Sequence, residues 1–240
     1  MENEPIQLAR TFARLAGELV QKPSVEETLE GITASAAREI AGTDFAGVSL
    51  LHKGGRFTTE AATAPLVREI DDIQYATRQG PCVDAIWERG IFAIDDMAHE
   101  QRWPEFVGKV RGLGVESMVS FQLATPRGTL GGLNLYAKKA GAFDTQSRDM
   151  GDVLADHAAI ALFSARKVWD LQQGMHTRQR IGEATGILME RFKVDDRQAF
   201  MLLSKASQDL NTKLRDLAQE LVYTGVLPDS GIPPRADGQA

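Results

Sequence analysis

The chain has one cysteine, Cys82, among its 240 residues, and its four histidines are scattered. A single thiol excludes an internal disulfide and a metal site made of several cysteines. His52, His99, His157 and His176 show no metal-ligand spacing of the H-E-x-x-H kind. The sequence also lacks a G-x-S-x-G nucleophile motif, a phosphate-binding loop and a dinucleotide fingerprint. We therefore predict no metal site, no catalytic residue and no enzymatic activity.

No apolar run is long enough to span a bilayer, and the acidic N-terminal sequence MENEPIQLAR does not resemble a signal peptide. We therefore expect a cytoplasmic protein without a membrane partner. Hydrophobic residues make up 43% of the chain and charged residues 25%, which is typical of globular proteins. The length allows two domains, each with a core of its own.

The charge of the chain is unevenly distributed. The formal net charge is −6, which by itself disfavours a nucleic-acid partner. Residues 1–165 carry 16 Lys and Arg against 23 Asp and Glu, whereas residues 166–226 carry 10 against 8. The acidity therefore belongs to the first part of the chain. The mildly basic second part is compatible with phosphate contacts.

Residues 1–165 predict an α+β domain around an antiparallel sheet. Apolar residues recur at intervals of three and four over 5–21, which indicates a helix. Ser24 with Glu27 three residues later is typical of a capping box, and Gly42 would close the helix that it starts. Strand patterns at 45–52, 57–63, 91–95, 117–125 and 130–137 alternate with helical patterns at 65–72, 82–89 and 103–113.

A single helix without proline is predicted from about 145 to 192, with Asp144 as its cap. Its apolar positions alternate by four and three, which is a heptad pattern of about three repeats with one polar member. These positions are Leu154, Ala158, Ala161, Ala165, Val168, Gln172 and Met175. The length favours a coiled-coil connector and a homodimer. The alternative is a helix that packs on the core of its own domain.

Two shorter helices complete a C-terminal module over 166–226. Asp195 or Asp196 can cap the first of them, and Asn211 or Thr212 can cap the second. Gly225 would end the last helix. The remaining residues, 227–240, are rich in proline and glycine and predict a flexible tail.

The C-terminal module resembles the ANTAR domain. The carrying motifs are T-R-Q-R-I-G-E-A-T-G-I-L-M-E-R from residue 177, A-F-M-L-L-S-K-A-S from residue 199 and N-T-K-L-R-D-L-A from residue 211. The resemblance implies RNA-binding antitermination, in which the protein binds paired stem-loops in nascent transcripts and prevents formation of the terminator hairpin. The chain departs from the family at Thr185, where Lys is usual, and at Ser204, where Arg is common, with Lys205 adjacent.

The first domain looks like the GAF domain that is commonly fused to actinobacterial ANTAR modules. The similar segments are Q-Y-A-T-R-Q-G-P-C-V-D-A-I at 74–86, D-D-M-A-H-E-Q-R-W-P at 95–104 and G-G-L-N-L-Y at 131–136. This resemblance implies a sensor domain that can hold a small molecule, with Cys82, Trp87 and Trp103 as pocket candidates. The sequence indicates no particular cofactor. A buried hydrophobic role is the alternative for Cys82, and a core role for the two tryptophans.

On the long helix, Arg178, Gly182, Thr185 and Met189 form one stripe, with Gly186 and Lys193 at its edge. We call this set the glycine stripe. Two glycines inside a helix cost about 1 kcal/mol each relative to alanine, so a close approach of another backbone is expected there. That backbone is either an RNA loop or another helix packed tightly on the small residues. Ala184 lies beside the stripe as a further RNA candidate or a packing residue.

Further candidates for RNA contact are Arg197, Lys205, Asn211, Lys213 and Arg215. Lys213 and Arg215 fall in the first turn of the last helix, where the helix dipole disfavours cations, which indicates an anionic partner. Asn211 can also serve as an N-cap. Phe192 and Phe200 are predicted to be buried, so recognition should depend on loop shape, cations and backbone proximity.

The leading hypothesis is a GAF–ANTAR transcription antiterminator. One alternative is a DNA-binding helix-turn-helix regulator, which the link 207–211 disfavours because it lacks a turn glycine. The other is a ligand-binding or enzymatic GAF protein whose C-terminus serves only for dimerisation.

Overall fold

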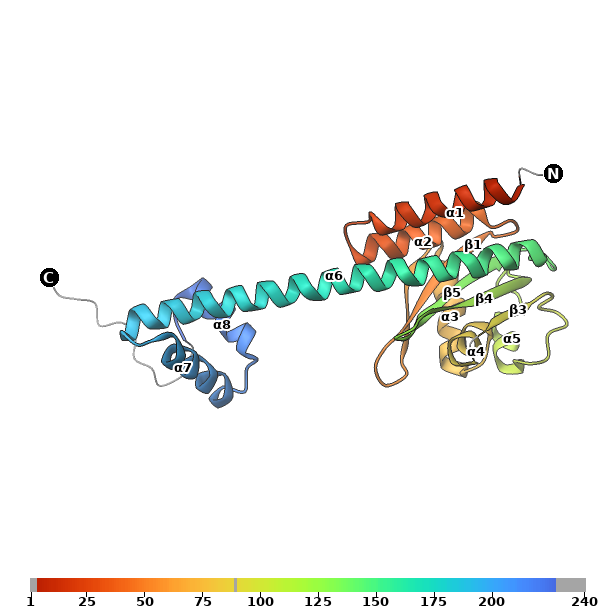
Figure 1. Cartoon of the computed structure of the whole chain (residues 1–240). Helices are drawn as coiled ribbons and strands as arrows, with labels where there is room; N and C mark the ends of the chain where they lie inside the picture. Colours follow the sequence, from red (N-terminus) through yellow and green to blue (C-terminus); the bar gives the residue numbers. More distant parts are fainter. Residues whose placement is uncertain (1–3, 89, 228–240) are drawn as a thin grey trace. The chain divides into compact units, whose positions relative to one another are not determined.

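The structure is a computed structural model that describes residues 4–88 and 90–227 (Figure 1). The chain divides into two compact units, Met1–Lys167 and Val168–Ala240. Of the predicted flexible tail, 227–240, all but Leu227 lies outside the described residues. In the part of the chain that is described, no helix combines the length and the apolar character needed to cross a membrane.

A five-stranded antiparallel sheet forms the centre of the first unit, as predicted. The strand order is β2-β1-β5-β4-β3, and every neighbouring pair is antiparallel. The strands are β1 (Phe45–Leu51), β2 (Phe57–Ala62), β3 (Ile91–Ile94), β4 (Ser117–Thr125) and β5 (Gly128–Ala137). Each lies within two residues of its predicted ends, because alternating apolar positions and glycine turns mark strands clearly.

Helices cover both faces of the sheet (Figure 1). One face packs on α1 (Glu4–Val20), α2 (Val25–Glu39) and the start of α6 (Thr145–Phe192). The other face packs on α3 (Pro65–Thr77), α4 (Pro81–Glu88) and α5 (Pro104–Val110). Met118 and Val119 on β4 belong to opposite cores, since successive strand residues point to opposite faces. The α+β fold class is therefore confirmed.

The helix boundaries follow local chemistry. Ser24 caps α2, and its hydroxyl accepts from the Glu27 amide at 3.0 Å. Helix α3 continues to Thr77, five residues beyond the prediction, because Gln74 extends its buried face. Helix α5 ends at Val110, earlier than predicted, because the glycines that follow it take a left-handed backbone.

The predicted long helix is confirmed as α6, and Asp144 accepts from the Ser147 amide at 2.8 Å. Its heptad pattern has two different environments. Leu154, Ala158 and Ala161 are buried in the core of the first unit, so the coiled-coil interpretation is wrong for these residues. Their side chains already pack on their own sheet. In the second unit Val168 and Met175 are 52% and 68% exposed, and there the coiled coil stays a prediction.

The second unit packs the end of α6 against α7 (Asp196–Asp209) and α8 (Leu214–Thr224). Asp195 caps α7 in a capping box with Gln198, whose backbone N–H donates to the Asp195 carboxylate at 2.7 Å. Gly225 ends α8 with a left-handed backbone, as predicted. The buried side chains of this core are Ala184, Leu188, Ala199, Leu203, Ala206, Leu217, Ala218, Leu221 and Leu227.

Two expectations for this module are wrong. Neither Asn211 nor Thr212 caps α8: the N-cap is Lys213, which makes no side-chain capping bond. Asn211 has a left-handed backbone (φ 50°) just after the end of α7, whereas an N-cap usually needs an extended one. Phe200 is 44% exposed, because it lies about 100° around the helix from its buried neighbour Ala199.

Candidate nucleic-acid interface

The two glycines of the glycine stripe lie on an open side of α6. Gly182 and Gly186 are both exposed, and a Cβ atom built at either would have no described neighbour within 4 Å. Tight helix packing at these glycines is therefore wrong for the described residues of this chain, and pairing with a helix of a second copy stays a prediction. No contact with the described residues compensates the helix for the propensity cost of these two glycines.

Two members of the predicted site contribute to the fold. Ala184 is fully buried in the core of the module, so it is a packing residue and cannot offer its side chain to RNA. Thr185 is half-buried, and its hydroxyl donates to the Ile181 carbonyl one turn earlier, at 2.7 Å. The position at which the family usually has Lys is therefore occupied here by a short side chain bound to its own helix.

The remaining candidates are exposed. Arg178 lies on α6, and Lys193 follows its last residue with a left-handed backbone (φ 54°). The Lys193 ammonium lies 2.8 Å from the Glu190 carboxylate, an exposed pair that contributes little to stability. The other exposed candidates are Arg197 and Lys205 on α7, Asn211 in the link, Lys213 at the N-cap of α8 and Arg215 in its first turn.

A groove between α6 and α8, which the sequence analysis missed, has a volume of about 610 Å³. We call it the α6–α8 groove. Its lining residues are Trp169, Gln173, His176, Thr177 and Arg180 on α6, with Arg215, Asp216 and Gln219 on α8. A sequence signal was present: Trp169, Gln173, His176 and Arg180 follow one another at intervals of four, three and four. That spacing places them on one side of a helix.

In the first unit, polar side chains gather between the sheet and α3. The centre is Asp71, whose carboxylate is fully buried. It accepts from Thr59 at 2.7 Å, from Gln74 and Asn134 at 3.1 Å each, and from the Tyr136 hydroxyl. We call these five residues the Asp71 cluster. Burial raises the pKa of Asp71 to about 6, although the hydrogen bonds act to lower it.

The three ligand-pocket candidates have different surroundings. Cys82 is buried beside the Asp71 cluster, with its Sγ atom 3.4 Å from the Ser49 hydroxyl. Burial raises the pKa of its thiol to about 12, which keeps it protonated and unreactive. Trp103 lies in the hydrophobic core, and its indole N–H donates to Asp84 at 2.9 Å. Trp87 is 59% exposed and meets Phe57 edge to face.

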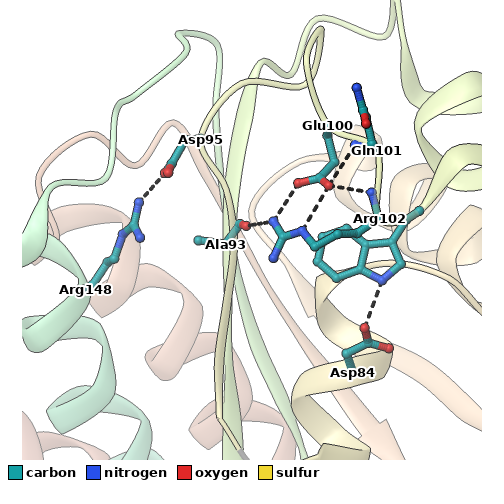
Figure 2. A network of polar contacts seen from close by, with 8 residues as sticks. Asp84, Ala93, Asp95, Glu100, Gln101, Arg102 and Arg148 are labelled. Carbon is teal, nitrogen blue, oxygen red and sulfur yellow. Dashed lines mark hydrogen bonds and ion pairs between the residues drawn. The ribbon is translucent and has the colours of Figure 1, made fainter.

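The segment D-D-M-A-H-E-Q-R-W-P forms a tightly bonded loop after β3 (Figure 2). Glu100 accepts from the backbone amides of Gln101 and Arg102 at 2.9 and 2.7 Å and pairs with the Arg102 guanidinium at 2.6 Å. Arg102 also donates to the Ala93 carbonyl of the edge strand. Asp95 pairs with Arg148 on α6. The Glu100 contacts order the loop internally, and the Arg102 and Asp95 contacts hold it to β3 and α6.

No set of three or more His, Cys, Asp or Glu side chains in the described ranges is arranged to hold a metal ion.

Two family models match the chain. The GAF domain model matches residues 22–162, which is more than half of the chain, and the ANTAR domain model matches residues 169–222. Both resemblances found in the sequence are thereby confirmed. No curated protein matches the chain significantly.

Solved structures with a similar fold match the chain at low identity. A GAF domain from an Acinetobacter phosphoenolpyruvate-protein phosphotransferase has 15% identity and a TM-score of 0.54, covering 67% of this chain and 95% of that chain. A domain of a Sinorhizobium meliloti sensor histidine kinase has 18% identity and a TM-score of 0.53, covering 63% and 99%. A free methionine-R-sulfoxide reductase from Neisseria meningitidis has 13% identity and a TM-score of 0.54, covering 67% and 91%. Such identities show a common fold alone, and a fold does not determine an activity.

Proposed function

Because the chain belongs to the GAF family and carries a C-terminal ANTAR domain, we propose that it is a transcription antiterminator that binds paired stem-loops in nascent RNA. We assign the GAF domain a sensory role and the ANTAR domain an RNA-binding role, and we propose no catalytic activity for either. An RNA partner of this type implies action in the cytoplasm, where transcripts emerge. The GAF domain supplies the control, through a small molecule or another signal.

The observation that carries this proposal is the open surface at Gly182 and Gly186. Both lie inside a continuous helix and inside the ANTAR match, and a Cβ atom at either would meet no described atom within 4 Å. Their cost to the helix is offset when an RNA backbone approaches closer than any side chain would allow. Arg178 and Lys193 border this surface and can contact the phosphates.

The electrostatic part of recognition comes from exposed cations. Arg197, Lys205, Lys213 and Arg215 extend the set beyond the glycine stripe, and Asn211 adds an exposed amide in the link. Lys213 and Arg215 stand at the positive end of the α8 dipole, so an anion there gains from both the helix and the side chains. We expect RNA affinity to fall steeply as salt concentration rises.

We also propose a homodimer through the exposed half of the heptad pattern on α6. Val168 and Met175 are exposed apolar side chains in the second unit, one turn on either side of Gln172. Pairing two helices there would bury both and bring together two RNA-binding modules. Two linked modules bind two stem-loops more tightly than either module alone, because the second contact becomes intramolecular.

The test is binding of the full chain to a pool of RNAs that carry two tandem stem-loops with randomised loops. We expect the pool to be bound, with duplex DNA failing to compete. Arg178→Ala and Lys213→Ala should each weaken binding and reduce the slope of log affinity against log salt by about 0.7 to 0.9. Preference for duplex DNA would favour the helix-turn-helix alternative. Unchanged affinity and slope in both variants would remove these two contacts.

A further inference from the structure

The α6–α8 groove combines an aromatic ring with two guanidinium groups. Trp169 is 52% exposed at the wall of a groove that is large enough for a nucleotide. The side chains of Arg180 and Arg215 are 48% and 58% exposed and enter the same groove from two different helices. An exposed indole beside arginines is a common arrangement for stacking an unpaired base and holding its phosphate.

Both arginines keep donors available for a ligand. Arg180 contacts Glu183 through one nitrogen at 2.8 Å, and Arg215 contacts Asp216 through one nitrogen at 3.1 Å. A guanidinium carries five N–H donors, so each of these pairs leaves others for a phosphate. Asp216 is the one carboxylate among the lining residues, against two arginines.

The groove is separate from the glycine stripe. On a helix that turns 100° per residue, Trp169 and Arg180 lie roughly 130° around α6 from Gly182 and Gly186. The remaining lining residues offer amide, hydroxyl and imidazole groups: Gln173, His176, Thr177 and Gln219. Such groups can bond the edge of a base or a ribose hydroxyl.

We propose that the α6–α8 groove is a second RNA subsite, which takes one unpaired nucleotide whose base stacks on Trp169 and whose phosphate pairs with Arg180 and Arg215. This inference rests on the proposed RNA-binding function and adds a contact that lies outside the glycine stripe. In this arrangement the glycine stripe contacts the backbone of the RNA loop. The groove accepts a base only when that base is unpaired.

The experiment compares variants of the full chain on the same stem-loop pool. Trp169→Ala should lower RNA affinity by about tenfold with an unchanged salt slope, because a stacked base is lost and no charge is removed. Trp169→Phe should recover most of that affinity, since it retains a ring. Arg180→Ala and Arg215→Ala should each weaken binding and reduce the salt slope by about 0.7.

Matched controls separate the groove from general effects. Tyr223→Ala removes an aromatic side chain of the same module that is 92% exposed, and Lys139→Ala removes an exposed cation of the first unit. Both should bind RNA like the unchanged chain. Far-UV circular dichroism of each variant checks that its helices are retained.

Three outcomes would overturn the proposal. If the unchanged chain binds the pool and Trp169→Ala binds equally well, the groove is not a subsite, while the proposed function stands. If the unchanged chain binds none of the RNAs, both proposals fail. If the Trp169 emission, obtained as the difference from Trp169→Phe, shifts with protein concentration in the absence of RNA, the groove belongs to a second copy of the chain.

Discussion

Helix α6 carries glycines in both units, and their surroundings are opposite. A Cβ atom at Gly151 would come within 2.2 Å of the ring of Phe121, a fully buried residue of β4. At Gly182 and Gly186 the same atom would have no described neighbour within 4 Å. The first glycine is required by packing inside its own domain. Among the described residues the other two meet no such requirement, and the proposed RNA partner would account for them.

Charge is distributed between the two units in a similarly contrasting way. The first unit buries the Asp71 carboxylate completely among hydroxyl and amide donors. The second unit keeps Arg178, Lys193, Lys205 and Lys213 on its surface. A buried carboxylate of this kind organises the inside of a domain, whereas exposed cations are available to an anionic partner.

The largest expected effect is the change in stability with pH that the buried Asp71 carboxyl causes. The folded chain holds the Asp71 proton more tightly than the unfolded chain does, because burial raises the pKa of the carboxyl from 3.8 to about 6. The resulting stabilisation is complete below about pH 4 and is lost as the pH rises through about 6, a change of about 3 kcal/mol. Urea unfolding of a Trp169→Phe variant, whose remaining tryptophans Trp87 and Trp103 both lie in the first unit, measures it by fluorescence at several pH values.

Asp71→Asn should abolish this pH dependence, because the amide does not ionise. Its exposed neighbour provides the control, since Asp72→Asn should retain most of the pH dependence. The groups facing Asp71 that could titrate in its place are Tyr75, Tyr136 and Cys82, and burial raises the pKa of each. A pH profile of Asp71→Asn identical to that of the unchanged chain would show that another group is responsible.

The next effect is on packing at the first glycine. Gly151→Ala should lower the free energy of unfolding of the first unit by about 2 kcal/mol, because overpacking against Phe121 outweighs the gain in helix propensity. Gly174→Ala on the same helix is the matched control, since its Cβ atom would have no described neighbour within 4 Å. In that control the free energy of unfolding should rise by about 1 kcal/mol, because alanine has the higher helix propensity. Equal effects of the two substitutions in denaturant unfolding would contradict the comparison.

The smallest effect on stability, about 1 kcal/mol per site, is expected at the open glycines. Gly182→Ala and Gly186→Ala should each stabilise α6 by that amount and yet lower RNA affinity by about tenfold. Gly174→Ala should show the same stabilisation with unchanged RNA affinity. Unfolding and RNA titration are measured on the same samples.

Gly182 and Gly186 could serve helix pairing in a dimer instead of RNA contact. Gly182 and Gly186 continue the heptad spacing beyond Met175, so a partner helix could also approach them. Analytical ultracentrifugation of the two variants distinguishes the cases. Loss of the dimer, with RNA affinity unchanged, would assign the glycines to helix pairing and remove them from the RNA surface.

Much of the fold could be predicted from local patterns. The strands, the capping residues Ser24 and Asp195 and the full extent of α6 follow from the spacing of apolar residues and from the chemistry of caps, which act within a few residues. The cap of α8 was predicted wrongly because Asn211 serves the end of the preceding helix. Asparagine is common both as the N-cap of a helix and as the left-handed residue after a helix end, so the residue type does not distinguish the two roles.

The site was less predictable than the fold. Arg178 and Lys213 could be proposed because exposed cations and a family motif mark them. The sequence could not assign Trp169 and Arg215 to one site, because they are 46 positions apart. Only the packing of α8 on α6 brings them to one groove. The burial of Ala184 likewise depends on which side of α6 the other two helices cover.

The amino-acid order by itself determined the helices, the strands, the acidic first domain and the mildly basic module, because each of these depends on residues close together in the chain or on composition. Only the tertiary structure decided that Gly151 is enclosed and Gly186 open, and that Asp71 lies buried among hydroxyl and amide donors. Those properties depend on which distant segments are packed against each residue, and the type of a residue does not determine its neighbours in space.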